Sequence, residues 1–319
     1  MWPPAGSASS VRLKASFRRA FVVLAYLNGQ FVPRATAAIS VEDRGFIFGD
    51  GVYEVWRVVN GRLFENERHL ERLAFGLREL RIPAPELVRA DALESVAHRV
   101  LAESGLLEGE ATFYVEITRG VAPRTHQFPV GGTIPTVFAM ANRFTPADAV
   151  RARGAVCITI TDIRWARCDI KTIQLLPNVL AKQAAAERDA IDAIMIRDGV
   201  VTESSHANVM GVLDGVVRTH QTDHLILAGV TRAVVLEIAR ELGYLVREEE
   251  FTEGDIARMT ELFLVGTTTD VMPVVRVDDV TIGDGRPGPV AQRLHAELRA
   301  RLDALPAAAR GDSRSLAAS

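Results

Sequence analysis

The chain has 319 residues, of which 48% are hydrophobic and 24% are charged, and its formal net charge is -3. This length suffices for one large or two ordinary globular domains, and the charge balance excludes the basic surface that nucleic-acid binding requires. No apolar stretch is long enough to span a membrane. The two cysteines, Cys157 and Cys168, argue against a disulfide framework or a cysteine metal site, which favours a reducing, cytoplasmic location.

The first predicted strand covers residues 21–27 and runs into Asn28-Gly29, a dipeptide typical of two-residue hairpins. No acidic residue precedes Glu42, as in a transit peptide, but the continuous strand and hairpin favour residues 1–20 as a disordered extension. Further hairpins are predicted at Asn60-Gly61, Asp198-Gly199 and Asp214-Gly215. Further strands are predicted at residues 52–59, 111–118, 136–140, 156–162, 190–196, 208–213 and 262–265.

Three helices are predicted between these strands. The first carries leucines at helical spacing on one face, and Asn66 could cap it. The second covers residues 86–104 and ends before Gly105. The third covers residues 231–242 and ends before Gly243, a residue typical of helix C-termini.

Hairpins followed by helices, without sustained strand–helix alternation, predict an α+β fold rather than a doubly wound sheet. We expect a small N-terminal α+β domain over residues 21–142, a linker at residues 143–149 and a larger domain over residues 150–303. Residues 304–319 are small and polar, so a disordered tail is predicted there.

Two segments indicate chemistry. Arg124 suits a planar carboxylate because its guanidinium donates two parallel hydrogen bonds, and His126 projects the same way if the loop is extended. Lys171, among apolar residues, offers an amine for covalent chemistry, although a lone lysine is usually a solvated surface residue. An amine beside a carboxylate trap suggests amino-acid chemistry through a Schiff base with an aldehyde cofactor.

Other residues could hold such a cofactor. A buried Glu203 would keep a pyridine nitrogen protonated. The helix start at Gly229-Val230-Thr231 offers free N–H groups to a phosphate, and Thr267 follows a strand with similar contacts. Arg72 could supply the countercharge. Taken alone, each also fits an ordinary structural role.

Tyr53 could hydrogen-bond a substrate carboxylate or a cofactor phosphate, or it could be a core tyrosine. The remaining histidines show no metal-ligand spacing, so no metal is expected. We predict surface or packing roles for His69, His98, His220, His224 and His295.

In unbroken order over about residues 25–300, the chain resembles the D-amino-acid transaminases, members of the fold-type IV pyridoxal-phosphate (PLP) enzymes. The likeness starts with Phe48-Gly49-Asp50-Gly51-Val52-Tyr53 and continues through the loop Pro123-Arg124-Thr125-His126. It also includes the segment ending in Asp169-Ile170-Lys171. The remaining matching segments are residues 180–183, 201–203, 227–232 and 261–263.

The resemblance implies a two-domain enzyme with PLP in the cleft between the domains. Lys171 would form the Schiff base and shuttle a proton, Glu203 would pair with the ring nitrogen, and Leu227 would support the ring. It further implies phosphate contacts from Arg72, Val230, Thr231 and Thr267. Tyr53, Arg124 and His126 would trap the substrate carboxylate. A homodimer is implied, because the partner subunit contributes the arginine–histidine loop in this family.

Some positions depart from the family pattern. His206 stands where the family has a run of serines, and Gly266 stands where the family has a serine beside the phosphate. One or two hydroxyl contacts are therefore lost. His206 could replace one of them. Trp56 and Arg57 also differ, and their effect on side-chain preference stays open.

The favoured hypothesis is transfer of the amino group from D-amino acids such as D-alanine and D-glutamate to a 2-oxo acid such as 2-oxoglutarate. The alternatives within the fold are an L-branched-chain aminotransferase and an aminodeoxychorismate lyase. A third possibility is a binding or regulatory protein that has kept the fold without catalysis.

Overall fold

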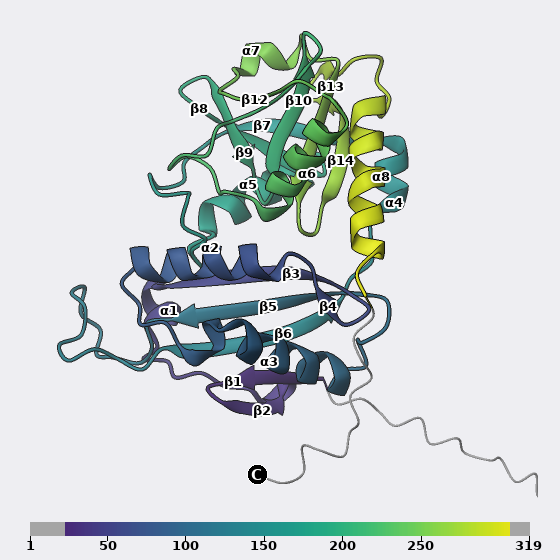
Figure 1. The fold of residues 1–319 in the computed structure, drawn as a ribbon. Coiled ribbons are helices and arrows are strands. Elements are labelled where there is room, and N and C mark those ends of the chain that lie inside the picture. The colour runs from purple at the N-terminus through teal and green to yellow at the C-terminus, as the bar shows by residue number, and fades with distance from the viewer. Residues whose placement is uncertain (1–22, 307–319) are drawn as a thin grey trace, which may run out of the picture.

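The computed structural model describes residues 23–306, so the predicted extension at residues 1–20 and most of the predicted tail lie outside them. Two sheets are stacked one above the other in Figure 1, each with helices packed on it. No helix among the described residues is long and apolar enough to cross a membrane.

The first sheet is antiparallel and has six strands in the order β2-β1-β6-β5-β3-β4. Its strands are β1 (Leu24–Leu27), β2 (Gln30–Pro33), β3 (Gly51–Val59), β4 (Arg62–Leu63), β5 (Glu110–Thr118) and β6 (Thr136–Arg143). The helical elements of this half are η1 (Arg34–Thr36), α1 (Arg44–Phe48), α2 (Asn66–Glu79), η2 (Glu86–Val88) and α3 (Ala90–Glu103). Its core packs α2 and α3 against the sheet, around Trp56, Leu93 and Phe113.

The second sheet is mixed and has nine strands, eight of them in the order β12-β11-β10-β13-β14-β7-β8-β9, with β15 paired to β14. These are β7 (Ala155–Thr161), β8 (Asp192–Arg197), β9 (Val200–Ser204), β10 (Asn208–Leu213), β11 (Val216–Thr219), β12 (Val246–Glu248), β13 (Glu261–Gly266), β14 (Asp270–Val277) and β15 (Val280–Thr281). The helices are α4 (Asp148–Arg153), α5 (Leu176–Ala186), α6 (Val230–Glu241), α7 (Glu253–Ile256) and α8 (Pro289–Asp303). Helices α6 and α8 pack together on one face through a core that includes Val235, Phe263 and Leu294.

The α+β prediction is confirmed, and so are the predicted strands, as far as they fall within the described residues, and the four hairpins. Each hairpin turns through a left-handed Asn or Asp followed by a left-handed Gly, the conformation that a two-residue turn requires. The third predicted helix is α6, which ends just before Gly243 as expected. Residues 144–147 join the two halves, between β6 and α4.

Two details of the helix predictions were wrong. Asn66 is the first residue of α2 rather than its cap, because Glu65 takes the cap position and the Asn66 amide donates instead to Glu94 on α3. The helix predicted over residues 86–104 is interrupted at Arg89, whose backbone is extended. Leu87 and Leu93 are both buried, and on an unbroken helix a separation of six residues would place their side chains about 120° apart around the axis.

A buried cluster of charged side chains links the two sheets through ion pairs and hydrogen bonds. Arg57 on β3 pairs with Glu110 on β5, donates to Asp270 on β14 at 3.3 Å and donates to the Thr267 carbonyl at 3.2 Å. The ring of Phe144 lies against its guanidinium. Arg57 is 2% exposed, so its charge depends on these partners.

We expect Arg57→Met to lower the free energy of unfolding by about 3 kcal/mol, because Asp270 would stay buried without this partner. Urea denaturation followed by circular dichroism measures the loss. Arg89→Met is the matched control, since Arg89 pairs only with exposed carboxylates, and its denaturation curve should match that of the wild type. Equal curves for all three proteins would contradict this role for Arg57.

Candidate active site

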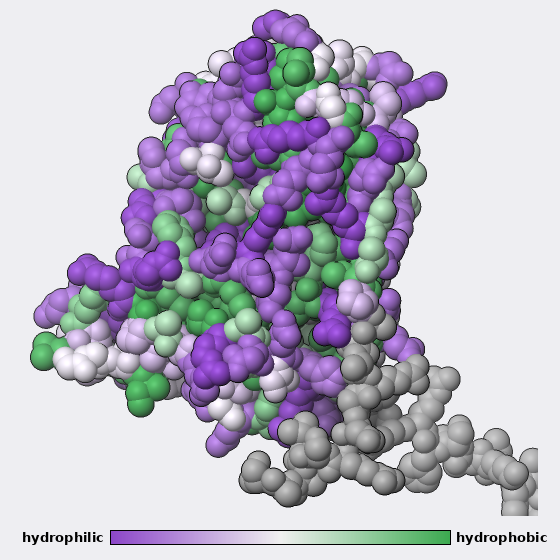
Figure 2. Space-filling model, in the orientation of Figure 1, coloured by the Kyte–Doolittle hydropathy of each residue, from purple (hydrophilic) through white to green (hydrophobic). Residues whose placement is uncertain are grey.

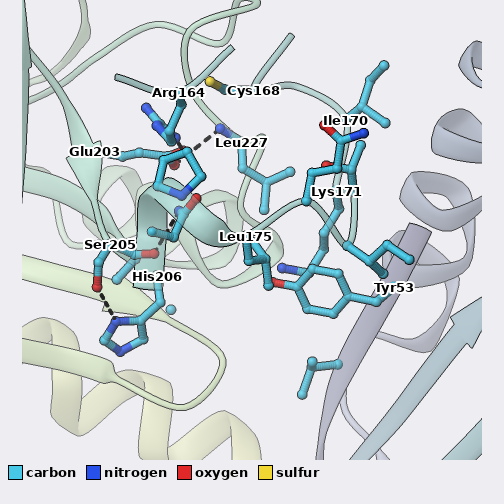
Figure 3. Close-up of a pocket in the computed structure, with 18 of the residues that line it drawn as sticks. Tyr53, Arg164, Cys168, Ile170, Lys171, Leu175, Glu203, Ser205, His206 and Leu227 are labelled. Atoms are coloured by element: carbon cyan, nitrogen blue, oxygen red, sulfur yellow. Dashed lines mark hydrogen bonds and ion pairs between the residues drawn. The ribbon is translucent and has the colours of Figure 1, made fainter. Parts of the chain in front are cut away.

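A cavity of about 940 Å³ is lined by residues of both halves of the structure (Figure 3). Its walls come from β3 and α2, from the loop between β7 and α5, from the turn between β9 and β10, and from the start of α6. All of the residues predicted to hold the cofactor line it, together with one predicted substrate contact: Tyr53, Arg72, Lys171, Glu203, Leu227, Val230, Thr231 and Thr267. Residues separated by up to about two thirds of the chain therefore meet at one site.

The amine of Lys171 lies in this cavity. Only three lysines occur in the sequence, Lys14, Lys171 and Lys182, and both of those in the described part line the cavity. The Lys171 carbonyl accepts a hydrogen bond from the Tyr53 N–H at 3.0 Å, and its Nζ lies 4.2 Å from the centre of the Tyr53 ring. The Lys182 amine is bound elsewhere, to the Ile191 carbonyl at 2.5 Å. Lys171 is therefore the better placed of the two amines for chemistry.

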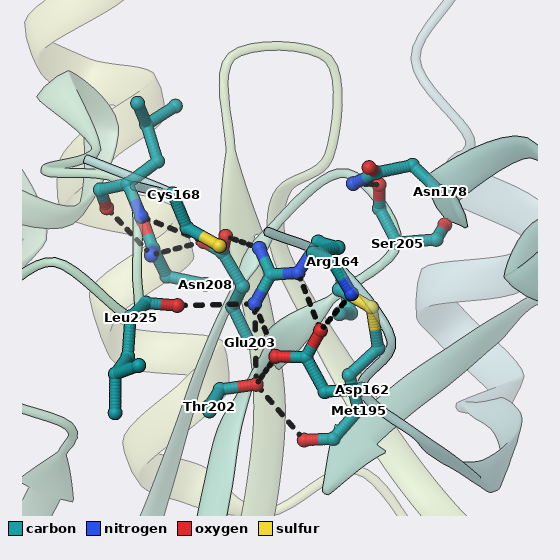
Figure 4. A network of polar contacts seen from close by, with 12 residues as sticks. Asp162, Arg164, Cys168, Asn178, Met195, Thr202, Glu203, Ser205, Asn208 and Leu225 are labelled. Carbon is teal, nitrogen blue, oxygen red and sulfur yellow. Dashed lines mark hydrogen bonds and ion pairs between the residues drawn. The ribbon is translucent and has the colours of Figure 1, made fainter. Parts of the chain in front are cut away.

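Glu203 is buried at the cavity wall and is held by a polar network (Figure 4). One carboxylate oxygen accepts from Arg164, and the other accepts from the Asn208 amide at 3.1 Å and from the Leu227 N–H at 3.2 Å. Arg164 also forms a two-pronged pair with Asp162, at 2.9 and 2.7 Å. The orientation of the Glu203 carboxylate is thus fixed from three sides.

Burial and the charge of Arg164 act in opposite directions on the pKa values of the two carboxylates. Burial raises the pKa of Glu203, and the charge and hydrogen bond of Arg164 limit that rise. Burial would also raise the pKa of Asp162, but the hydrogen bonds and charge of Arg164 lower it to about 2. Arg164 is therefore a cation shared by two buried carboxylates.

A second network holds Arg72. Its guanidinium donates to the fully buried Glu54 at 2.7 and 2.9 Å and to the Ala228 carbonyl at 2.8 Å. His69 lies 3.0 Å from the same carboxylate. Burial opposes the charge on Glu54, but Arg72 and His69 hold its pKa well below the ordinary value. Arg72 thus links α2 to the loop that precedes α6.

The start of α6 and the turn after β13 offer donors to an anion. The cap position of α6, Gly229, makes no side-chain capping bond, and Gly229, Val230 and Thr231 all line the cavity. A Cβ on Gly229 would clash with the Asn208 side chain, so glycine lets this loop approach the site. Free N–H groups at a helix start, with threonine hydroxyls, suit a phosphate.

Arg124 and His126 are not among the residues that line this cavity. Their loop lies against Phe48, whose ring centre is 5.6 Å from that of His126 and 5.4 Å from the Arg124 guanidinium carbon. Arg44 holds the loop by donating to the Thr125 carbonyl at 2.7 Å. Within one chain, Arg124 and His126 therefore lie outside the cavity lining, against Phe48, whereas Tyr53 lies inside it beside Lys171.

Sequence reasoning assigned no role to Glu54, Arg164 or Asp162, and it expected His69 to be a surface or packing residue. The sequence does contain a signal for Glu54. Side chains alternate between the two faces of a strand, so Glu54 points to the face opposite to that of Tyr53, and this places a carboxylate on the buried side. Trp56 and Arg57, whose effect was left open, do not line the cavity, because Trp56 lies in the core and Arg57 in the charge cluster.

The spacing of the histidines predicted no metal site. In the folded chain, His220, Asp223 and Glu250 have potential ligand atoms within 4.8 Å of one another. The Gln221 amide lies 3.4 and 3.2 Å from these two carboxylates. This group lies away from the cavity lining.

Comparison with known proteins identifies the type of site. Residues 51–277 match the family described as amino-transferase class IV. The chain is 38% identical over 271 residues to the D-alanine aminotransferase of Listeria monocytogenes, covering 84% of this chain and 92% of that protein. It is also 38% identical to the D-alanine aminotransferase of Bacillus licheniformis, covering 85% and 94%.

Among solved structures, the fold is similar to the T.th. branched-chain amino acid aminotransferase complexed with N-(5'-phosphopyridoxyl)-L-glutamate. The TM-score is 0.79 at 28% identity, covering 89% of this chain and 96% of that one. A fold IV-transaminase from Curtobacterium pusillum gives a TM-score of 0.74 at 26% identity, covering 87% and 94%.

We expect Asp162→Asn to lower the free energy of unfolding by about 2 kcal/mol near neutral pH. The folded pKa of about 2 lies below the ordinary value, so the stabilisation is present above about pH 4 and is lost as the pH falls toward 2. Urea denaturation should therefore give a difference between wild type and variant at pH 7 that shrinks at about pH 3. The exposed Asp189, changed to Asn, is the control. An equal difference at both pH values would contradict the assignment.

Proposed function

The chain belongs to the class IV aminotransferase family, and from that premise we propose that it transfers the amino group of D-amino acids to a 2-oxo acid, with PLP as cofactor. The observation that carries the proposal is the meeting of Lys171, Glu203 and the start of α6 in one cavity. The D-alanine aminotransferases that match most of the chain support D-alanine as donor. The acceptor that we propose is 2-oxoglutarate. The reducing, cytoplasmic location expected from the cysteine content stays a prediction.

The donors around the cavity fit PLP. The phosphate would be held by the N–H groups and hydroxyl of Val230 and Thr231, by Thr267 and by the charge of Arg72. Glu203, oriented by Arg164 and Asn208, would accept the hydrogen bond of the ring nitrogen. Leu227 would support one face of the ring, and its N–H helps fix Glu203.

When bound, PLP supplies an electron sink that stabilises negative charge at the substrate Cα. The protein has to deliver and remove a proton at that atom. Lys171 Nζ is the group for this, because it is the cavity's one amine that is not bound to a backbone carbonyl in the described structure. Tyr53, beside it, would orient the substrate carboxylate and thereby select which Cα hydrogen faces the amine.

We further propose a homodimer in which each subunit's Arg124 and His126 bind the carboxylate in the partner's cavity. The loop between β5 and β6 projects from the body of the chain (Figure 1), and it exposes Val121, Val130 and Ile134. Phe46, on α1, is 70% exposed, and apolar residues reach the surface in this part of Figure 2. An apolar surface of this kind favours a protein partner.

One alternative has specific support. The similarity in fold to the T.th. branched-chain amino acid aminotransferase favours L-branched-chain amino acids as substrates. Against this, the curated relatives that match along most of the chain are D-alanine aminotransferases. Two further alternatives are compatible with the same fold: an aminodeoxychorismate lyase and a protein without catalysis.

Incubation of the purified protein with D-alanine and 2-oxoglutarate should yield pyruvate, with ping-pong kinetics because the amino group is carried by the enzyme between two half-reactions. L-Alanine is the matched control and should be at least about 100-fold slower, since the wrong Cα hydrogen would face Lys171. Reaction of L-leucine or L-valine without D-alanine would favour the branched-chain alternative. Pyruvate formed from aminodeoxychorismate without any amino acceptor would favour the lyase.

Mixed dimers test the exchange of the Arg124 loop. Lys171→Ala and Arg124→Ala should each lose most activity, whereas Lys182→Ala should keep the Cα proton transfer. If the loop acts in the partner's cavity, dissociated and reassociated mixtures of the two inactive variants recover about a quarter of wild-type activity, because half the dimers carry one intact site. If each loop served its own cavity, no mixed dimer would have an intact site and no activity would return.

A further inference from the structure

A buried carboxylate lies behind one corner of the cavity and has an imidazole as its neighbour. Asp192 begins β8, and its side chain has no exposure to solvent. One of its oxygens accepts from the Ser205 hydroxyl and from the Ala193 N–H at 2.8 Å. The other, Oδ2, lies 3.1 Å from Nδ1 of His206 but has no donor of good hydrogen-bond geometry among the described residues.

This carboxylate stays charged because of cations beside it. Burial would raise the pKa of Asp192, but the close approach and charge of His206, followed by the charge of Lys182, lower it to about 2. Lys182 Nζ is 3.9 Å away and its side chain is 45% exposed. The imidazole is therefore the closest positive partner of a fully buried negative charge.

The same imidazole lines the cavity. His206 sits in the turn between β9 and β10, beside Ser205 in Figure 3, and its side chain is 42% exposed. Its Nε2 lies 3.5 Å from the Thr269 hydroxyl, in the turn between β13 and β14 that also contains Thr267. Nδ1 thus lies 3.2 Å from the Ser205 hydroxyl and 3.1 Å from Asp192, and Nε2 lies on the side of the turn that contains Thr267.

We propose that Asp192 and His206 form a charge pair that presents an imidazolium N–H to the cofactor phosphate, a binding contact in addition to those of Arg72, Thr231 and Thr267. The proposal rests on the proposed use of PLP. With Nδ1 beside Asp192, the Nε2–H of the imidazolium form can donate to an anion.

Other charged groups near this corner are few. Asp192 on β8 and Lys182 on α5 face it from behind. Beyond Thr269, Asp270 is already paired with Arg57 and Arg151. Lys171 and Glu203 line other walls of the cavity. A comparison with a His206 variant should therefore isolate this contact, since His206 is the histidine among the residues that line this cavity and the ionisation of the phosphate is common to both proteins.

The test compares binding of PLP and of pyridoxal, which lacks the phosphate, to the full-length protein freed of cofactor. His206→Gln should weaken PLP binding about tenfold at about pH 6, the effect of one charge-assisted hydrogen bond, and should leave pyridoxal binding unchanged. At about pH 9 the difference should largely disappear, because a neutral imidazole no longer adds charge. His224→Gln, at an exposed histidine, is the matched control.

Asp192→Asn tests the other half of the pair. It should reproduce the loss of PLP affinity, and the double variant with His206→Gln should be no weaker than either single variant. Circular dichroism checks that the substitution of Asp192 leaves the fold intact. If the fold is lost, the comparison of PLP and pyridoxal binding by His206→Gln decides the test.

The outcomes separate the two proposals. If the wild type binds neither PLP nor pyridoxal, the proposed function fails. If it binds PLP but His206→Gln binds equally well at both pH values, the inference is overturned while the function stands. An equal loss for PLP and pyridoxal also overturns it, because the contact would then not be to the phosphate.

Discussion

Glu203 is buried at the wall of the cavity, where loss of water favours the neutral acid, and Arg164 supplies the positive charge that opposes this. Arg164 is itself buried and depends on Asp162 for its second partner. Removing Arg164 would leave two buried carboxylates without their shared cation in a low-dielectric environment, which costs several kcal/mol. The loop from β7 toward α5, which carries Lys171, is therefore tied to the same strands that carry Glu203.

The cavity exists because two sheets with separate cores are held at a fixed separation. Arg72 crosses from α2 to the Ala228 carbonyl, and Arg57 crosses from β3 to Thr267 and Asp270. Both guanidiniums reach backbone carbonyls in the segments proposed to bind the phosphate. Charged side chains that join the halves thus also hold the segments of the proposed phosphate site, which would couple cofactor binding to the arrangement of the sheets.

The fold alone does not select the substrate. Enzymes named for D-alanine and for branched-chain amino acids share this architecture with the chain, so selection depends on the groups around the substrate carboxylate and side chain. In a single chain, Arg124 and His126 lie outside the cavity that contains Lys171. In the proposed homodimer, the partner subunit's loop would bring these two residues to the cavity.

Local signals in the sequence determined the strands, the hairpins and the α6 helix, because left-handed Asn-Gly and Asp-Gly turns and side-chain periodicity act over a few residues. They also indicated Lys171, Glu203 and the α6 start, whose chemical types are distinctive. The break at Arg89 and the partners of Glu54, Arg164 and Asp192 were decided only by tertiary structure. These depend on which buried charges meet across the two sheets, and no spacing along the chain encodes the low dielectric that forces such charges to pair.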